Sequence, residues 1–97
     1  MFIVSLIYTK PLEQINAHLE DHRAFLDKFY QKEIFLMSGR KEPRTGGIII
    51  MNVESIDDVH RIIQEDPFHE HDVAEYQITE FYPSKVAAGL EKYQQIQ

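Results

Sequence analysis

The chain of 97 residues has no cysteine, which excludes disulfide bonds and thiol chemistry. It is also poor in positive charge, with ten Lys and Arg residues against sixteen Asp and Glu residues. This balance argues against nucleic acid as a partner, because nucleic-acid binding needs a basic face. The apolar N-terminal run FIVSLIY is too short to cross a membrane and lacks the charged start of a signal peptide. We therefore expect a soluble, cytoplasmic protein that binds neither membranes nor nucleic acid.

Apolar residues are present in two kinds of pattern, and the first kind is typical of β-strands. These segments are rich in β-branched and aromatic residues or alternate apolar with polar positions. Four strands are predicted, over residues 2–8, 34–38, 47–53 and 74–82. The strands at residues 2–8 and 47–53 are apolar on both faces, which indicates that both faces are covered.

The second pattern is the spacing of three and four residues that is typical of amphipathic helices. The first predicted helix begins behind a Thr9 cap and ends near Glu33. Its apolar stripe consists of Leu12, Ile15, Leu19, His22, Leu26 and Phe29. The second predicted helix follows a capping-box-like Ser55 and ends near Glu65.

The order of these segments is β-α-β-β-α-β, followed by a short helix predicted after Pro83. With right-handed crossovers, this order builds an α+β, ferredoxin-like domain with two helices on one face of a four-stranded antiparallel sheet. We expect residues 1–97 to form one domain, with a core at residues 1–83 and a C-terminal helical tail at residues 84–97. Because the second face of the sheet also needs a cover, we expect a homodimer that packs sheet to sheet.

His22 and Asp66 are the strongest candidates for chemistry. A lone histidine in an apolar stripe is more often structural than catalytic, so His22 needs a partner to carry function. Pro67 disfavours helical geometry at Asp66, so the second helix should stop there. A carboxylate near the negative end of a helix dipole gains no stabilisation from it and also needs a partner. Since the two helices lie side by side in this fold, we predict a hydrogen bond of roughly 2.6–3.2 Å between the two side chains.

Such a bond would orient the imidazole and leave its other nitrogen free to transfer a proton near neutral pH. The site is then expected to be a pocket in which the free nitrogen faces a cavity. Two simpler interpretations stay open from the residues alone. Asp66 is also an ordinary turn former before proline, and the pair could be a buried polar tie between two helices.

The loop between the second and third strands, GRKEPRTG at residues 39–46, is the next candidate. Arg40 and Arg44 carry planar guanidinium groups suited to carboxylate or phosphate, and glycines let the backbone approach a ligand. We therefore expect Ser38, Arg40 and Arg44 to contact substrate. The simpler interpretation is a solvated hairpin loop, which composition alone favours.

A histidine-rich stretch raises the question of a metal. His69 and His71 lie close to His60 in sequence and among carboxylates, but the stretch is predicted to be a turn rather than a strand that would align the two rings. We predict no metal site and no cofactor, since zinc, flavin, phosphate-loop and serine-nucleophile motifs are missing from the sequence.

The chain resembles the YciI-like (YCII-related) family of the dimeric α+β barrel superfamily. The matching pieces are HRAFL (22–26), SGRKEPRTGGIII (38–50), EDPF (65–68) and AEYQITEFYP (74–83). The resemblance implies a ferredoxin-like subunit, a sheet-to-sheet dimer, and an active site built on a His and an Asp that map onto His22 and Asp66. Better-studied branches carry an arginine where this chain has Leu19. One type of member is a dehydrochlorinase acting on a chlorinated hydroxyquinol.

Together these observations predict a small-molecule-binding protein with cofactor-free acid–base chemistry on an anionic or aromatic compound, of the lyase or dehydrochlorinase kind. His22 would carry the proton, Asp66 would orient it, and the ligand-contacting residues would be Ser38, Arg40 and Arg44. The alternatives are a non-catalytic ligand-binding or regulatory module and a cofactor-independent, monooxygenase-like enzyme.

Overall fold

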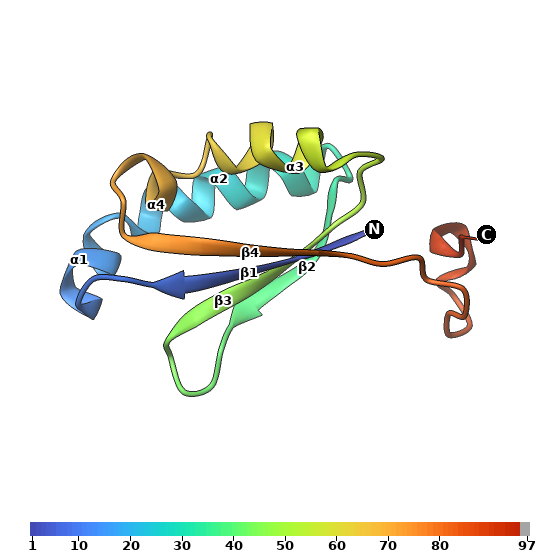
Figure 1. Ribbon diagram of the computed structural model, residues 1–97, viewed down its shortest axis with the longest axis horizontal. Helices are drawn as coiled ribbons and strands as arrows, with labels where there is room; N and C mark the ends of the chain where they lie inside the picture. Colours follow the sequence, from blue (N-terminus) through green and yellow to red (C-terminus); the bar gives the residue numbers. More distant parts are fainter. Residues whose placement is uncertain (96–97) are drawn as a thin grey trace.

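The computed structural model of the protein describes residues 1–95 (Figure 1). Its elements are β1 (Phe2–Tyr8), α1 (Leu12–Ala17), α2 (Leu19–Gln31), β2 (Phe35–Arg40), β3 (Gly46–Met51), α3 (Ile56–Ile63), α4 (Pro67–Glu70), β4 (Ala74–Glu80) and the 3-10 helix η1 (Glu91–Tyr93). The four strands form one antiparallel sheet in the order β2-β3-β1-β4. With α2 and α3 on one face of this sheet (Figure 1), the predicted α+β, ferredoxin-like fold is confirmed.

The core lies between the helices and one face of the sheet. On β1, Phe2, Val4 and Leu6 are buried, and they alternate with half-buried residues on the opposite face. Leu6 pairs with Gly47 on one side and with Tyr76 on the other, so these three residues share the helix-covered face. The site described below is built on this face.

The opposite face of the sheet carries no helix among α1–α4 (Figure 1). Ile3 pairs with Ile50 across β1 and β3, and both are only half buried. Met37 on β2 pairs with Ile50 and is 60% exposed. An apolar face of this kind therefore remains accessible in the single chain.

The first residue of β3, Gly46, lies very close to the backbone of β1. A Cβ atom at Gly46 would lie 1.8 Å from the carbonyl oxygen of Leu6, so only glycine fits there. The Tyr8 N–H donates to the carbonyl of Thr45 at 2.9 Å, which extends this contact into the loop. The loop that carries Arg44 is thereby held against the end of β1.

Several predicted boundaries were wrong. The first helix is divided at His18 into α1 and α2, Thr9 does not cap it, and Leu12 is 43% exposed instead of inward-facing. The break separates α1 from α2. Ile15, His22 and Phe29 of the predicted stripe are buried, and Phe25, which the stripe did not include, is buried as well. The second strand extends through Arg40, so the loop is shorter than predicted.

The predicted C-terminal helix was also wrong. Of the described tail residues, only Glu91–Tyr93 form a helical turn, and no residue of that turn is buried. Gly89 has φ of +97°, which interrupts a regular helix before it starts. The tail leaves the end of β4 away from α4 (Figure 1), so little of the domain is available to pack a helix. The last two residues of the prediction, 96–97, lie outside the described chain.

Candidate functional site

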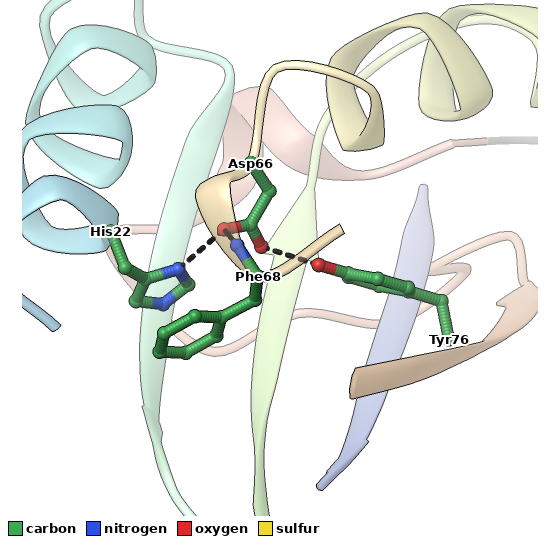
Figure 2. Close-up of polar contacts among 4 residues, drawn as sticks. All are labelled: His22, Asp66, Phe68 and Tyr76. Atoms are coloured by element: carbon green, nitrogen blue, oxygen red, sulfur yellow. Dashed lines mark hydrogen bonds and ion pairs between the residues drawn. The ribbon is translucent and has the colours of Figure 1, made fainter. Parts of the chain in front are cut away.

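His22 and Asp66 meet as predicted. The His22 Nδ1 and Asp66 Oδ1 atoms are 2.8 Å apart, and the Asp66 side chain is fully buried (Figure 2). His22 comes from the inward face of α2, and Asp66 lies directly before α4. Because an ionised carboxylate only accepts hydrogen bonds, Nδ1 carries the hydrogen in this pair. The other ring nitrogen, Nε2, is then the proton acceptor of the neutral imidazole.

Asp66 is held by a local device that the sequence interpretation missed. It is the N-cap of α4, with extended backbone geometry, and its Oδ1 accepts the Phe68 N–H at 3.0 Å. Pro67 occupies the first helical turn, where its missing N–H costs nothing. Asp66 therefore caps the N-terminus of α4, in addition to lying just after the end of α3. The capping bond fixes the carboxylate in the position from which it reaches His22.

A third donor, Tyr76, completes the carboxylate's surroundings. The Tyr76 hydroxyl donates to Asp66 Oδ2 at 2.7 Å, from the neighbouring strand β4 (Figure 2). Burial raises the pKa of Tyr76 above its ordinary value, and the nearby charge of Asp66 and the hydrogen bond to it raise it further. Tyr76 therefore stays a neutral donor. Its inward position in the β4 alternation was predictable, and a buried hydroxyl there needs a partner.

The other side of the His22 ring is aromatic. The His22 and Phe68 rings are stacked, with centroids 4.0 Å apart and planes 6° from parallel (Figure 2). Phe68 is itself almost fully buried. A hydrogen bond at Nδ1 and a stacked ring on one face thus fix the orientation of the imidazole.

A cavity lies beside the imidazole. His22 lines a hollow of about 370 Å³ between α2, the β2–β3 hairpin and the end of β1. Within residues 1–95, Nε2 has no hydrogen-bond partner, yet every fully buried side-chain nitrogen or oxygen has one. Nε2 is therefore open to the cavity. Asp66 does not line this hollow and lies behind the imidazole.

The three predicted ligand contacts, Ser38, Arg40 and Arg44, all line this cavity. Ser38 shares a 2.6 Å hydrogen bond with the hydroxyl of Tyr30, which orients it. Arg44 donates to the side-chain oxygen of Asn16 at 2.6 Å, which ties the loop to α1. Arg40 ends β2 on the exposed rim of the cavity.

Arg23 also lines the cavity, and the sequence interpretation missed it. It follows His22 directly and lies one helical turn after Leu19, which lines the same cavity. That spacing of four residues places both on one side of α2 and was a usable signal.

The remaining histidines do not gather around this cavity or around a metal position. The His71 and His18 rings are stacked, with centroids 3.9 Å apart. The ring centroids of His69 and Tyr76 are 6.0 Å apart. Among residues 1–95, no group of three or more His, Asp or Glu side chains is arranged to hold a metal ion.

Known families provide the next comparison. The sequence model of the YCII-related domain matches residues 1–82, which is most of the chain. The chain belongs to the YCII-related family. A search of curated proteins found no match to this family member.

A solved structure shares the fold of this YCII-related protein. It is 5-chloro-2-hydroxyhydroquinone dehydrochlorinase from Burkholderia phenoliruptrix AC1100, in complex with 2,5-dihydroxybenzoquinone. The TM-score is 0.70 and the sequence identity 22%, and the match covers 84% of this chain and 93% of that chain. The identity is low, so the likeness establishes a common fold.

No helix within residues 1–95 has the length and apolar character needed to span a bilayer.

Proposed function

We propose that this YCII-related protein is a cofactor-free acid–base enzyme that acts on a small molecule bound beside His22. The observation that carries this proposal is the free Nε2 of a largely buried imidazole, open to a cavity and set by a 2.8 Å bond to a fully buried carboxylate. An oriented imidazole of this kind is a typical general base. A purely structural tie between helices would not need the second nitrogen exposed to a cavity.

The proposed step is proton abstraction by Nε2. The lone pair on Nε2 accepts a proton from an acidic C–H or O–H of the ligand, and the imidazolium that forms is stabilised by the Asp66 carboxylate. Where the ligand carries a leaving group, the electrons of the broken C–H bond form a double bond and the leaving group departs with its own electron pair. His22 then returns its proton to water. The solved neighbour's name, a dehydrochlorinase, is consistent with this type of elimination.

The second candidate function is non-catalytic binding of a small ligand. The observation that favours it is that the cavity wall has a single imidazole as a candidate base. Ser38, Arg40 and Arg44 on the same wall are suited to binding a ligand. A binding module would retain ligand without turning it over. The two functions therefore differ in whether a change at His22 removes a reaction or only weakens binding.

The test is a turnover assay on chlorinated hydroxyhydroquinones and on small carbon acids. Chloride release is followed with an ion electrode, and hydrogen–deuterium exchange at acidic C–H positions is followed by proton NMR in D₂O. We expect the wild-type protein to catalyse at least one of these reactions and His22→Asn to abolish it. The matched control is His60→Asn, which makes the same change at an exposed histidine on α3. Equal rates for wild type and His22→Asn on every compound would contradict the proposal.

We also propose that two copies associate through the accessible sheet face. The support is the half-buried pair Ile3 and Ile50 together with Met37, which is 60% exposed, on a face that no helix from α1 to α4 covers. Light scattering is expected to give the mass of a dimer at micromolar concentration. Ile50→Glu is expected to give a monomer, whereas Ile56→Glu, on the exposed side of α3, should leave the dimer intact. A monomeric wild-type protein would contradict this association.

A further inference from the structure

The charges around the cavity are distributed unlike those of the whole chain. The chain is acidic, with a formal net charge of −6, and it contains four arginines. Three of them, Arg23, Arg40 and Arg44, line the cavity beside His22. None of the Asp and Glu residues in the described 95 residues lines it. The cavity is therefore a concentrated positive region in a negative protein.

These three guanidinium groups are not neutralised by the protein. The ion pairs within residues 1–95 are His22–Asp66, Lys28–Glu65 and Arg61–Asp58, so none involves a cavity arginine. Arg44 donates only to the amide oxygen of Asn16, which is uncharged. The fourth arginine, Arg61, is the one that has a carboxylate partner, and it lies on α3 outside the cavity.

Three like charges around one hollow repel one another, and their hydrogen-bond donors remain available. Each guanidinium presents donors in a planar fork that matches a carboxylate in two parallel hydrogen bonds. The three line one cavity from separate elements, namely α2, the end of β2 and the β2–β3 loop. An anionic group of a ligand would supply the partner that the protein lacks.

The rest of the cavity wall is apolar. Leu6, Leu19, Leu26, Ile49 and Phe68 contribute to it. A volume of about 370 Å³ lies near the lower end of the range for ligand pockets of roughly 300–1,000 Å³. The wall therefore suits an apolar, ring-sized body that carries its charge at one end.

We infer that the ligand of this site is a small organic acid, with its carboxylate on the guanidinium groups of Arg23, Arg40 and Arg44 and its apolar body against Phe68 and the leucines. This inference rests on the proposed function, because the same cavity presents His22 Nε2 to the body of the ligand. It adds the chemical class of the substrate. Fixing the carboxylate at one end sets which carbon faces the base.

The experiment compares benzoate with benzamide, which is nearly the same shape but neutral, by isothermal titration calorimetry on the full chain. Benzoate is expected to bind about tenfold more tightly than benzamide, because the charge-assisted bonds are made only by the anion. Arg23→Gln and Arg40→Gln should each remove most of that preference. Arg61→Gln, the matched control on α3, should leave it unchanged.

The inference would be overturned by equal affinity for benzoate and benzamide, by a preference that survives both cavity substitutions, or by no binding of either probe. Tight binding of inorganic phosphate without binding of benzoate would also overturn it, in favour of a simple anion site. Failure of the proposed function is a separate result. His22→Asn should keep the preference for benzoate while it loses turnover, so a site that binds organic acids without turnover is distinguishable from one that does neither.

Discussion

Two walls of the cavity contrast in how firmly they are held: one is the His22 imidazole, which Asp66 supports from behind, and the other carries Arg40 and Arg44. Behind the imidazole, Asp66 is fully buried and accepts hydrogen bonds from His22, Phe68 and Tyr76. Across the cavity, Arg40 is exposed and Arg44 has a single bond to an uncharged amide. The group proposed for chemistry is thus fixed, whereas the groups proposed for binding keep their freedom. Substitutions on the two walls should accordingly have very different costs to the fold.

Replacing Asp66 should have the largest effect on stability. Asp66→Ala leaves two buried donors and one half-buried donor without an acceptor and removes the α4 cap, so we expect the free energy of unfolding to fall by about 3–5 kcal/mol. Asp66→Asn keeps the shape and the acceptor oxygen, so we expect a smaller loss of about 1–2 kcal/mol. Urea denaturation followed by circular dichroism measures both.

The comparison of these two variants separates folding from chemistry. An amide at residue 66 can bond the ring but cannot stabilise the imidazolium, so turnover should fall much further in Asp66→Asn than stability does. Equal stability losses in the two variants would show that the carboxylate is not held by three donors as described.

Tyr76→Phe should have the next largest effect. It leaves Asp66 Oδ2 without its donor, and we expect a loss of about 1–3 kcal/mol near neutral pH. Tyr82→Phe is the matched control, because it removes the hydroxyl of a side chain that is half exposed. Losses of the same size in both variants would show that the hydrogen bond from Tyr76 to Asp66 does not stabilise the fold.

The raised pKa of Tyr76 predicts that the free energy of unfolding depends on pH in the alkaline range. Since the pKa of Tyr76 is raised in the folded protein, only the unfolded chain releases this proton when the pH rises above about 10. The contribution of Tyr76 is therefore complete below that pH and is lost above it, by about 1.4 kcal/mol per pH unit. Urea denaturation between pH 9 and 11 should show a shallower fall in Tyr76→Phe than in wild type. Parallel pH profiles would contradict this.

Ser38→Ala should cost less. The bond between Ser38 and Tyr30 is exposed, and its loss is expected to lower the free energy of unfolding by roughly 0.5–1 kcal/mol. Thermal unfolding of Ser38→Ala and Tyr30→Phe should give similar values, because each removes one side of the same hydrogen bond. Additive losses in the double variant would show that the two hydroxyls act independently.

Arg40→Ala should have the smallest effect on the ligand-free protein, within about 0.5 kcal/mol of wild type. Its effect should appear when benzoate is present, since a ligand that binds only the folded state raises stability with the logarithm of its concentration relative to its dissociation constant. Differential scanning fluorimetry with and without benzoate compares the two conditions. A large loss without ligand would indicate that Arg40 holds the fold, which would weaken the contrast between the two walls.

Local rules in the sequence were sufficient for the buried pair. The three- and four-residue spacing placed His22 inward, and the β-α-β-β-α-β order brought the two helices together. Pro67 correctly put Asp66 outside the second helix, although α3 already ends at Ile63. Tyr76 and Arg23 were not assigned to the site, because tertiary packing between elements far apart in the chain brings Tyr76 to Asp66 and Arg23 to the cavity. Periodicity alone also could not show that Gly89 would prevent a helix in a tail with little to pack against.

The capping bond between Asp66 and the Phe68 N–H gives the site a natural reporter. The same oxygen accepts from the Phe68 amide and from His22, so the short helix and the oriented imidazole form or dissolve together. A single backbone amide proton therefore records whether the His22–Asp66 geometry is assembled. Its rate of exchange with solvent measures how often the site opens while the rest of the domain stays folded.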